Sequence, residues 1–259
     1  MAYDTRPGLQ SVTRALQALE LIADAGELGV TELGRRLGVH KATASRLAAT
    51  LAERGLVERN PITDRYRLGF GLIRLAGAAM ANLDVVRAAR PVLEELAETT
   101  RETVNLGLLA GDDVVYIDQV NGARSIVSAN WVGRRTPLHS SASGKVLLAF
   151  MPEPDQDRLL RRRLPAATPR TIVDPDALRR QLAEVRTLGF AQIQAELEEG
   201  LNAVAAHIRQ ADGAVVATLS VSGPSFRVRG IDLTRLGRIA IDAAASVSRR
   251  LGHSGRRQE

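Results

Sequence analysis

The sequence predicts an α+β protein whose 259 residues fold into two parts. In the first part, apolar residues recur three and four positions apart, as in short amphipathic helices, and then alternate with polar residues, as in a hairpin. In the second part, strand-like segments joined by turns stand between helices, which favours an antiparallel sheet flanked by helices. With 45% hydrophobic residues, a chain of this length can fill two cores.

Two short helices joined by a tight turn are predicted within residues 31–54. Thr31 can cap the first, which carries two leucines one turn apart, and a glycine-containing turn at residues 38–40 follows, as in helix-turn-helix pairs. The second helix has an apolar stripe with the spacing i, i+3, i+4 and i+7, and Gly55 follows where a glycine commonly ends a helix. The stripe consists of Ala44, Leu47, Ala48 and Leu51.

The opposite side of this second helix has the residue types that a DNA-reading helix uses. Arginine can bond guanine in the major groove, hydroxyls can bond bases or phosphates, and small alanines let the backbone come close. Alternating residues around a turn at 60–64 predict a hairpin, or wing, whose arginines would lie along the phosphate backbone. The predicted DNA-binding residues are His40, Lys41, Ala42, Thr43, Ser45, Arg46, Thr50, Arg59, Arg65 and Arg67.

An alternative is an ordinary helical fragment with solvated arginines, because short helix pairs and charged faces are common. The hairpin and the local charge favour DNA binding, since residues 31–68 hold eight basic and four acidic side chains. The whole chain has a net charge of +6 and a pI near 10.5, which also favours a polyanionic partner. These features predict a winged helix-turn-helix that binds double-stranded DNA.

Composition argues against several other classes of protein. The chain has no cysteine and four scattered histidines, so we expect no disulfide, no metal site and no cofactor. The first ten residues lack the apolar region of a signal peptide, and no apolar run reaches the roughly 18 residues of a membrane span. The protein is therefore expected in the cytoplasm.

Further helices are expected on both sides of the helix pair. Ser11 can cap a first helix, and Gly26 and Gly29 mark its end. Residues 69–83 form a predicted helix rich in glycine and alanine, which would let another helix approach closely. We interpret it as a linker helix that packs on its counterpart in a second subunit, because a palindromic DNA site requires a dimer. A rigid spacer within one chain is the alternative.

The second part begins with a predicted helix over residues 84–99, in which Pro91 is expected to mark a restart. Further helices are predicted over 143–150, 175–188, with Asp174 as N-cap, and 233–251. Strands are predicted over 103–109, 114–120, 126–132, 190–194, 201–209 and 214–221. A loop is expected at 134–142. Such an arrangement can enclose a small-molecule pocket.

No catalytic motif is complete in this part. Gly144-Lys145 lacks the upstream glycine and the following hydroxyl residue of a phosphate-binding loop. Glutamates 196, 198 and 199 offer carboxylates, but a solvated loop is the simpler interpretation. An enzyme that transforms a small molecule through Lys145 or His139 is the alternative function, and it predicts turnover without operator preference. A nucleoid-type DNA binder without ligand control is a second alternative, which the long second part argues against.

The second part is better suited to binding a ligand. Ser143, Gly144 and Lys145 open a predicted helix, whose free N–H groups and positive dipole end can hold a carboxylate. Ser220 and Ser222 on a predicted strand offer hydroxyl groups. The alternative is that Ser143 only caps the helix and that Ser222 ends an edge strand.

Ten short motifs occur in order along nearly the whole chain. They are SVTRAL (11–16), ATASRL (42–47), RGLV (54–57), YRLG (66–69), ETVNL (102–106), VVYI (114–117), GRRTPLH (133–139), SGKVLLA (143–149), EGL (199–201) and SVSGP (220–224). In this order they resemble the IclR family of bacterial transcription regulators. The resemblance implies an N-terminal winged helix-turn-helix, a linker helix that pairs in dimers, and a C-terminal GAF-like effector domain, often in a dimer of dimers.

The resemblance also implies a ligand and its site. Family members bind a small metabolite, often an organic or aromatic acid, between the sheet and the loop before the helix at 143–150, and so change the expression of catabolic genes. Matching positions implicate Leu138, Ala142, Ser143, Gly144, Leu201, Ala203, Ser220 and Ser222. His207 stands where the family commonly has proline, and we expect it to alter hydrogen bonding at the strand edge.

We therefore expect a DNA-binding domain at 1–68, a linker and dimerisation helix at 69–84, a GAF-like effector-binding domain at 85–252 and a flexible tail at 253–259. The predicted function is a sequence-specific DNA-binding transcription regulator, a repressor or an activator, whose effector changes the spacing of two winged helices. The predicted partners are double-stranded operator DNA, a small-molecule effector, and further copies of the chain in a homodimer or a dimer of dimers.

Overall fold

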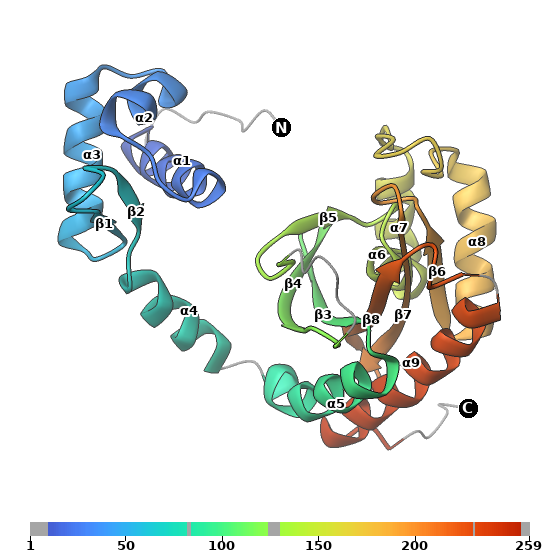
Figure 1. The fold of residues 1–259 in the computed structure, drawn as a ribbon. Helices are drawn as coiled ribbons and strands as arrows, with labels where there is room; N and C mark the ends of the chain where they lie inside the picture. Colours follow the sequence, from blue (N-terminus) through green and yellow to red (C-terminus); the bar gives the residue numbers. More distant parts are fainter. Residues whose placement is uncertain (1–9, 82–83, 124–129, 230, 255–259) are drawn as a thin grey trace. The chain divides into compact units, whose positions relative to one another are not determined.

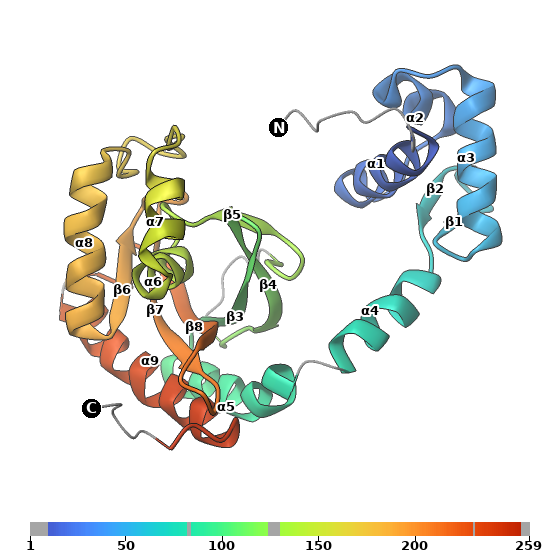
Figure 2. The ribbon, with the colours of Figure 1, turned by 180° about the vertical axis from the view of Figure 1, so that it is seen from behind.

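The computed structural model describes residues 10–81, 84–123, 130–229 and 231–254, which belong to two compact units, Met1–Asn82 and Leu83–Glu259 (Figures 1 and 2). The first has one hydrophobic core, and the second has a core on each face of its sheet. These elements confirm the predicted α+β class. Among the described residues, none of the helices combines the length and the apolar character needed to cross a membrane.

Three helices form the core of the first unit. They are α1 (Gln10–Ala25), α2 (Val30–Leu37) and α3 (Lys41–Glu53). The predicted stripe of α3 faces this core, because Ala44, Ala48 and Leu51 are buried there beside Ile22 of α1 and Leu33 of α2. The opposite side of α3 is left to solvent, as the spacing predicts.

The wing follows α3 as a hairpin of two strands. They are β1 (Val57–Arg59) and β2 (Tyr66–Leu68). Leu28 adds a bridge on the other side of β2, with backbone hydrogen bonds of 2.9 and 2.8 Å. Glu27 accepts hydrogen bonds from Asn60 Nδ2 (2.7 Å) and Thr63 Oγ1 (2.9 Å), and both lower the pKa of its carboxyl group. These contacts fix the wing against the loop between α1 and α2.

The second unit is built on one antiparallel sheet with the strand order β5-β4-β3-β8-β7-β6. Its strands are β3 (Thr103–Ala110), β4 (Asp113–Val120), β5 (Arg135–Pro137), β6 (Phe190–Gln194), β7 (Leu201–Arg209) and β8 (Val215–Pro224). Its helices are α5 (Asp84–Thr100), α6 (Ala142–Phe150), α7 (Glu153–Leu160), α8 (Pro175–Leu188) and α9 (Ile231–Arg250). The helix α4 (Gly71–Ala81) belongs to the first unit.

The two faces of the sheet pack on different helices (Figures 1 and 2). On one face, α5 and α9 cover alternate residues of the central strands, such as Leu106, Val204 and Leu219, in a mainly apolar core. On the other face, α6 and α8 cover apolar residues that include Ile193 and Ala205. The second face also carries the polar side chains of Asn105 on β3 and Ser220 on β8, which lie beside each other in register.

Three predictions about helix ends were wrong. Thr31 does not cap α2, which begins at Val30 after Gly29 and has no side-chain cap bond. Ser11 lies inside α1. Pro91 does not restart the helix, because α5 runs through it without a break. An interior proline costs a helix about 3 kcal/mol, and α5 offsets that cost by burying six residues along one side.

Two elements were not predicted. Residues 135–137, expected within a loop, pair with β4 as the short strand β5. Three residues are too few to show an alternation. The helix α7 follows Pro152 and buries only three of its eight residues, so its apolar spacing is weak.

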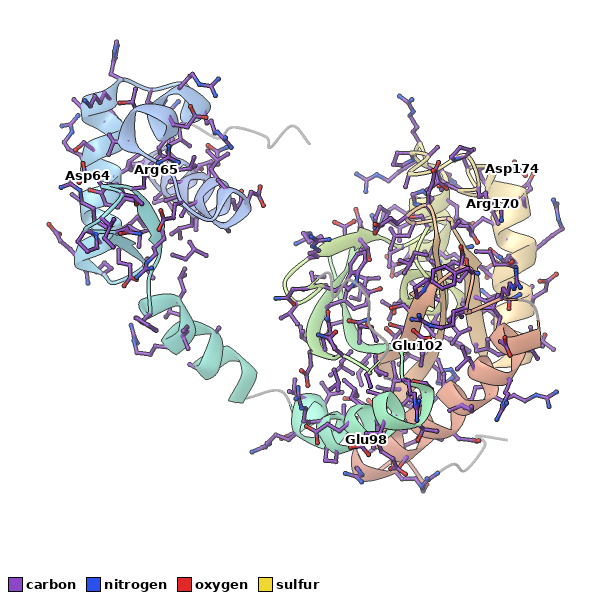
Figure 3. All side chains as sticks on the ribbon, in the orientation of Figure 1. Asp64, Arg65, Glu98, Glu102, Arg170 and Asp174 are labelled. Carbon is purple, nitrogen blue, oxygen red and sulfur yellow. The ribbon has the colours of Figure 1, made fainter. Side chains whose placement is uncertain are left out.

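Three further predictions concern the N-cap of α8, the strand at 126–132 and the tail at 253–259. Asp174, labelled in Figure 3, is the N-cap of α8 as predicted, and its side chain accepts a hydrogen bond of 2.8 Å from the N–H of Ala177. Of the strand predicted at 126–132, residues 126–129 lie outside the described residues. In the described remainder, Val132 forms an isolated bridge to Tyr116. Most of the predicted tail at 253–259 also lies outside the described residues.

A buried ion pair holds the loop between β6 and β7 against α6. Lys145 is fully buried, and its Nζ donates a hydrogen bond of 2.5 Å to Oε2 of Glu196, which is 6% exposed. Burial lowers the pKa of the Lys145 ammonium, and the charge of Glu196 opposes that shift. From the other side, Thr168 and Thr171 donate to the backbone oxygens of residues 195 and 196. The interpretation as a solvated loop was therefore wrong for Glu196.

His207 lies within β7, which continues through it to Arg209. The ring centroid of His207 is 4.4 Å from that of Phe150. The Arg209 guanidinium stacks on the same Phe150 ring, 5.1 Å from its centroid. Burial lowers the pKa of His207 to about 4, and the charges of Arg209 and His253 act in the same direction. The histidine is thus accommodated in its neutral form.

We predict that Lys145→Met lowers the free energy of unfolding by about 3–5 kcal/mol, because it leaves a carboxylate buried without a partner. The double variant Lys145→Met/Glu196→Leu removes both charges and should recover most of that loss. Denaturant unfolding measures both effects. Arg179→Met, which breaks an exposed ion pair in the same unit, is the matched control and should cost at most about 1 kcal/mol. A double variant no more stable than Lys145→Met would contradict this account.

We also predict that His207 makes the second unit sensitive to acid. An unfolded histidine has a pKa near 6.5 and the folded one about 4, so the unfolded state binds more protons between these values. Stability should fall as the pH drops through that window. Between pH 7 and pH 5, the loss should be smaller by about 2 kcal/mol in His207→Phe than in the natural protein. Thermal or denaturant unfolding at the two pH values measures the loss. An equal loss of stability in both proteins would show that His207 is not responsible.

Candidate DNA-binding surface and ligand cavity

The structure places the predicted DNA-binding residues on one helix and on the adjoining wing. Nine of the ten are exposed, and Thr43 is partly buried. His40, Lys41 and Ala42 stand at the first turn of α3, where His40 is the N-cap residue, and Arg46 lies one turn later. An exposed helix start with a basic side chain and small neighbours has the shape and charge that a major groove accepts.

The wing arginines differ in their partners. Arg59 pairs with Asp64 at 2.6 Å, and Arg67 pairs with Glu58 at 2.7 Å. Arg65, labelled beside Asp64 in Figure 3, makes no ion pair with any described residue. Arg65 is therefore ready to contact a phosphate, whereas Arg59 and Arg67 must first exchange a carboxylate for one.

An apolar groove of about 500 Å³ lies between α1 and α3. Val12 and Leu16 line it from α1 and are 49% and 57% exposed, and Leu47 lines it from α3. Arg46 and Thr50, which are predicted to contact DNA, also line this groove. The reading side of α3 thus adjoins an apolar surface that the first unit does not cover.

The helix α4 is a second uncovered apolar surface in the same unit. Ile73 and Leu75 are 65% and 48% exposed, and the whole stretch from 73 to 78 is exposed. Its first residue, Gly71, donates its N–H to the Gly55 oxygen at 2.8 Å, and a Cβ at Gly71 would lie 2.7 Å from that oxygen. This close approach fixes the start of α4 against the turn between α3 and β1.

In the second unit, a small cavity lies between the polar face of the sheet and the start of α6. Five predicted effector-binding residues line it: Ala142, Leu201, Ala203, Ser220 and Ser222. The other three predicted residues, Leu138, Ser143 and Gly144, are buried beside it without lining it. The free space is about 20 Å³, which is roughly the space of one water molecule. Any larger ligand must displace side chains on entry.

Sequence reasoning missed several residues of the cavity wall. They are Asn105, Tyr116, Trp131, Ser141 and Leu197. Asn105 could have been noticed as the single amide in a mostly apolar strand. The alternation of side chains puts it on the same face of the sheet as Tyr116 of the neighbouring strand. Trp131 packs edge-on against Tyr116 with ring centroids 6.0 Å apart, and nothing in the sequence indicates that contact.

The start of α6 is built differently from the prediction. Ser141, not Ser143, is the N-cap, and its hydroxyl accepts the N–H of Gly144 at 3.1 Å. Gly144 lies so close to Leu138 that a Cβ would come within 2.3 Å of the Leu138 carbonyl oxygen. The loop before α6 therefore lies directly on the helix, and it brings Ser141 and Ala142 to the cavity.

Hydrogen bonds connect the residues just after the C-terminal end of β8, near Ser222, to the residue before β3. Arg227 donates two hydrogen bonds, of 2.6 and 2.9 Å, to the carboxylate of Glu102, which is labelled in Figure 3. Thr103, the next residue, pairs in register with Ser222. This ion pair keeps the serine at the edge of the cavity.

The chemistry of the cavity is that of a binding site. Burial raises the pKa of the Tyr116 phenol, while the hydroxyls of Ser143, Thr136 and Ser220 oppose that shift. His139 is buried outside the cavity, with its Nε2 2.9 Å from the carbonyl oxygen of Pro165. The described lining residues include no charged side chain. They can hold a ligand through neutral hydrogen-bonding groups and apolar contacts.

Comparison with known proteins identifies the family. The family model described as the bacterial transcriptional regulator IclR C-terminal domain matches residues 77–249, and that of the IclR helix-turn-helix domain matches residues 11–61. The HTH-type transcriptional regulator XynR of Escherichia coli (strain K12) is 34% identical over 249 residues, which are 95% of this chain and 99% of that protein. BhcR of Paracoccus denitrificans (strain Pd 1222), another HTH-type regulator, is 37% identical over 93% of this chain and 87% of its own.

Solved structures agree with these matches. An IclR transcriptional regulator from Alicyclobacillus acidocaldarius has a TM-score of 0.81 and 33% identity, with 93% of this chain and 98% of that chain covered. An IclR homologue from Microbacterium hydrocarbonoxydans, complexed with 4-hydroxybenzoate, has a TM-score of 0.82 and 28% identity, with 94% and 98% covered. The matched proteins are named as regulators, which confirms the predicted regulator over the alternative of an enzyme. The chain belongs to the IclR family of bacterial transcription regulators.

Proposed function

We propose that this protein binds a specific operator in the cytoplasm through paired winged helices, and that a small organic acid in the cavity of the second unit changes this binding. The observation that carries the proposal is the exposed start of α3 beside a basic wing, in a chain of the IclR family. The domains of the proposal are those expected from the sequence, with DNA binding at 1–68, the linker helix at 69–84 and effector binding at 85–252.

On DNA, α3 would enter the major groove with Arg46 directed at base edges. The wing would lie on the phosphate backbone, where Arg65 adds affinity that depends on salt and not on sequence. Hydroxyls from Thr43, Ser45 and Thr50 would complete the reading surface.

A homodimer is supported by the two uncovered apolar surfaces of the first unit. The groove between α1 and α3 and the exposed side of α4 are both apolar, and no residue of α4 is among those that line the groove. In a pair of chains, α4 of each can seat in the groove of the other, which gives a closed twofold assembly. Such an assembly would present two α3 helices to half-sites about 34 Å apart.

The effector site is supported by the cavity, whose lining includes five of the positions implied by the family resemblance. The Microbacterium relative was solved with 4-hydroxybenzoate, an aromatic acid. An acid that favours one spacing of the paired helices by about 1–3 kcal/mol would shift operator affinity about 5- to 150-fold.

The proposal is tested by binding the purified protein to its own upstream DNA and to random DNA across a salt series, with and without a panel of small acids. Specific binding that one acid strengthens or weakens is the expected result. Binding with equal affinity to both DNAs at every salt concentration would overturn the proposed function.

We predict that Arg46→Ala lowers affinity for the operator by about 1–3 kcal/mol and relaxes sequence preference, while affinity for random DNA changes little. Arg65→Ala is the matched control on the same surface. It should weaken both kinds of DNA alike and lower the slope of log affinity against log salt by about one. Equal losses on operator and random DNA for Arg46→Ala would contradict the role of Arg46.

We predict that Ile73→Glu converts the dimer to a monomer, because it places a carboxylate where an apolar groove would receive α4. Leu16→Glu, on the groove itself, should do the same. Phe226→Glu, which changes an equally exposed apolar residue of the second unit, serves as the control. Light scattering across a dilution series measures the mass. If both first-unit variants keep the mass of the natural protein, the proposed assembly is wrong.

A further inference from the structure

The turn at the tip of the wing carries an apolar side chain that contacts almost nothing in its own unit. Ile62 stands in this turn, between β1 and β2, and is 91% exposed, more than any other large apolar residue that the structure describes. A single exposed apolar residue is common on protein surfaces. What distinguishes Ile62 is the construction of the turn that presents it.

Hydrogen bonds fix the backbone of this turn. The Oδ1 of Asn60 accepts the N–H of Ile62 at 2.9 Å, and the carbonyl oxygen of Asn60 accepts the N–H of Asp64 at 2.9 Å. Glu27, from the loop between α1 and α2, holds the side chains of Asn60 and Thr63. The fold thus positions the backbone of Ile62 while it leaves the side chain free. A contact that is preorganised in this way costs little entropy when a partner binds.

The acidic groups of the turn have partners within the first unit. Asp64 pairs with Arg59 at 2.6 Å. The Glu27 carboxylate accepts the two hydrogen bonds just described, and the charges of Arg65 and Arg67 help to lower its pKa. Neighbouring groups therefore compensate these carboxylates, so the turn can approach a polyanion such as DNA.

The wing follows a helix that is proposed to enter the major groove, so the surfaces within its reach are those beside that groove. The phosphate strand comes first and suits the wing arginines. Beyond it lies the minor groove, about 6 Å wide, which is walled by sugars and floored by base edges. An apolar side chain gains nothing from phosphates, but it can pack on sugars and base edges. Isoleucine is one of the residue types that proteins place in the minor groove.

The floor of the minor groove differs between base pairs in one group. A G·C pair carries the amino group of guanine there, and an A·T pair carries only acceptors. This amino group projects from the floor and fills the centre of the groove, where the side chain of an isoleucine would otherwise pack. Over an A·T pair that space is open. Minor grooves rich in A·T pairs are also narrower, which brings the sugar walls closer to an apolar side chain.

We propose that Ile62 enters the minor groove next to the half-site that α3 reads, and that it selects A·T pairs at that position. The wing is then a second reader of sequence, in addition to its contacts with phosphates. This inference rests on the proposed operator binding and adds to it a specificity-determining residue and the base pair that it prefers.

The test alters one groove of the DNA at a time. Diaminopurine in place of adenine adds the amino group to the minor groove of an A·T pair, and inosine in place of guanine removes it from a G·C pair. The hydrogen-bonding groups of the major groove stay the same in both exchanges. A footprint of the full-length protein on its own upstream DNA defines the operator. Synthetic duplexes of that operator, each with one base pair exchanged, are then compared by fluorescence anisotropy.

At the position that Ile62 covers in each half-site, the four base pairs should fall into two groups. The A·T and inosine·C duplexes should bind alike, and the G·C and diaminopurine·T duplexes should bind about 5- to 30-fold more weakly. A position read in the major groove gives the other grouping, in which diaminopurine·T binds like A·T and inosine·C binds like G·C. The grouping therefore shows which groove is read.

Variants assign the preference to Ile62. Ile62→Ala should bind the four duplexes with nearly equal affinity, because it lacks the side chain that fills the groove. Ile62→Val keeps a branched apolar side chain and should keep the grouping. Since Ile62 is almost fully exposed, neither change removes packing, and both variants should unfold at the temperature of the natural protein.

The outcomes separate the inference from the proposed function. If the protein prefers its upstream DNA to random DNA at no salt concentration, both fail. If it binds specifically but no position shows the minor-groove grouping, the function stands and the role of Ile62 is overturned. A minor-groove grouping that persists unchanged in Ile62→Ala would also overturn it.

Discussion

The alternation of side chains along β3, β7 and β8 is the constraint on which the second unit depends. Because successive residues point to opposite faces, each strand must serve two environments with one sequence. Val104, Leu106 and Leu219 supply the apolar core under α5 and α9, while Asn105 and Ser220 face α6. A shift of register by one residue would bury the polar set in the core and empty the cavity of its hydrogen-bonding groups. Fold and ligand chemistry are therefore specified by the same pattern.

Much of this architecture could be predicted from the sequence, and the failures have physical causes. The stripe of α3, the wing and the long strands have strong periodicity, so they were predicted nearly to the residue. The short strand β5 (Arg135–Pro137) and the polar helix α7 carry too few apolar residues to show a period. The N-cap of α6 is Ser141, whereas the sequence pointed to Ser143, because two serines that stand two residues apart fit the same local pattern.

The cavity shows the same division between local and distant information. Positions implied by the family resemblance supplied Ala203, Ser220 and Ser222, but residues on other strands, such as Asn105 and Tyr116, were missed. Their roles depend on which strands become neighbours, and the pairing between β3 and β8 joins residues that are 111 to 119 positions apart in the sequence. The pair of Lys145 and Glu196 was missed for the same reason. Local patterns predict elements, whereas buried polar partners are decided by topology.

We propose that DNA and an acid bind to different units of one molecule and influence each other. Thermodynamic linkage then requires reciprocity, because an acid that changes operator affinity by some factor must have its own affinity changed by the operator by the same factor. The most direct measurement is a titration of the acid into the protein, alone and saturated with operator. Equal factors in the two directions are the predicted result. An acid affinity that the operator leaves unchanged would contradict the account.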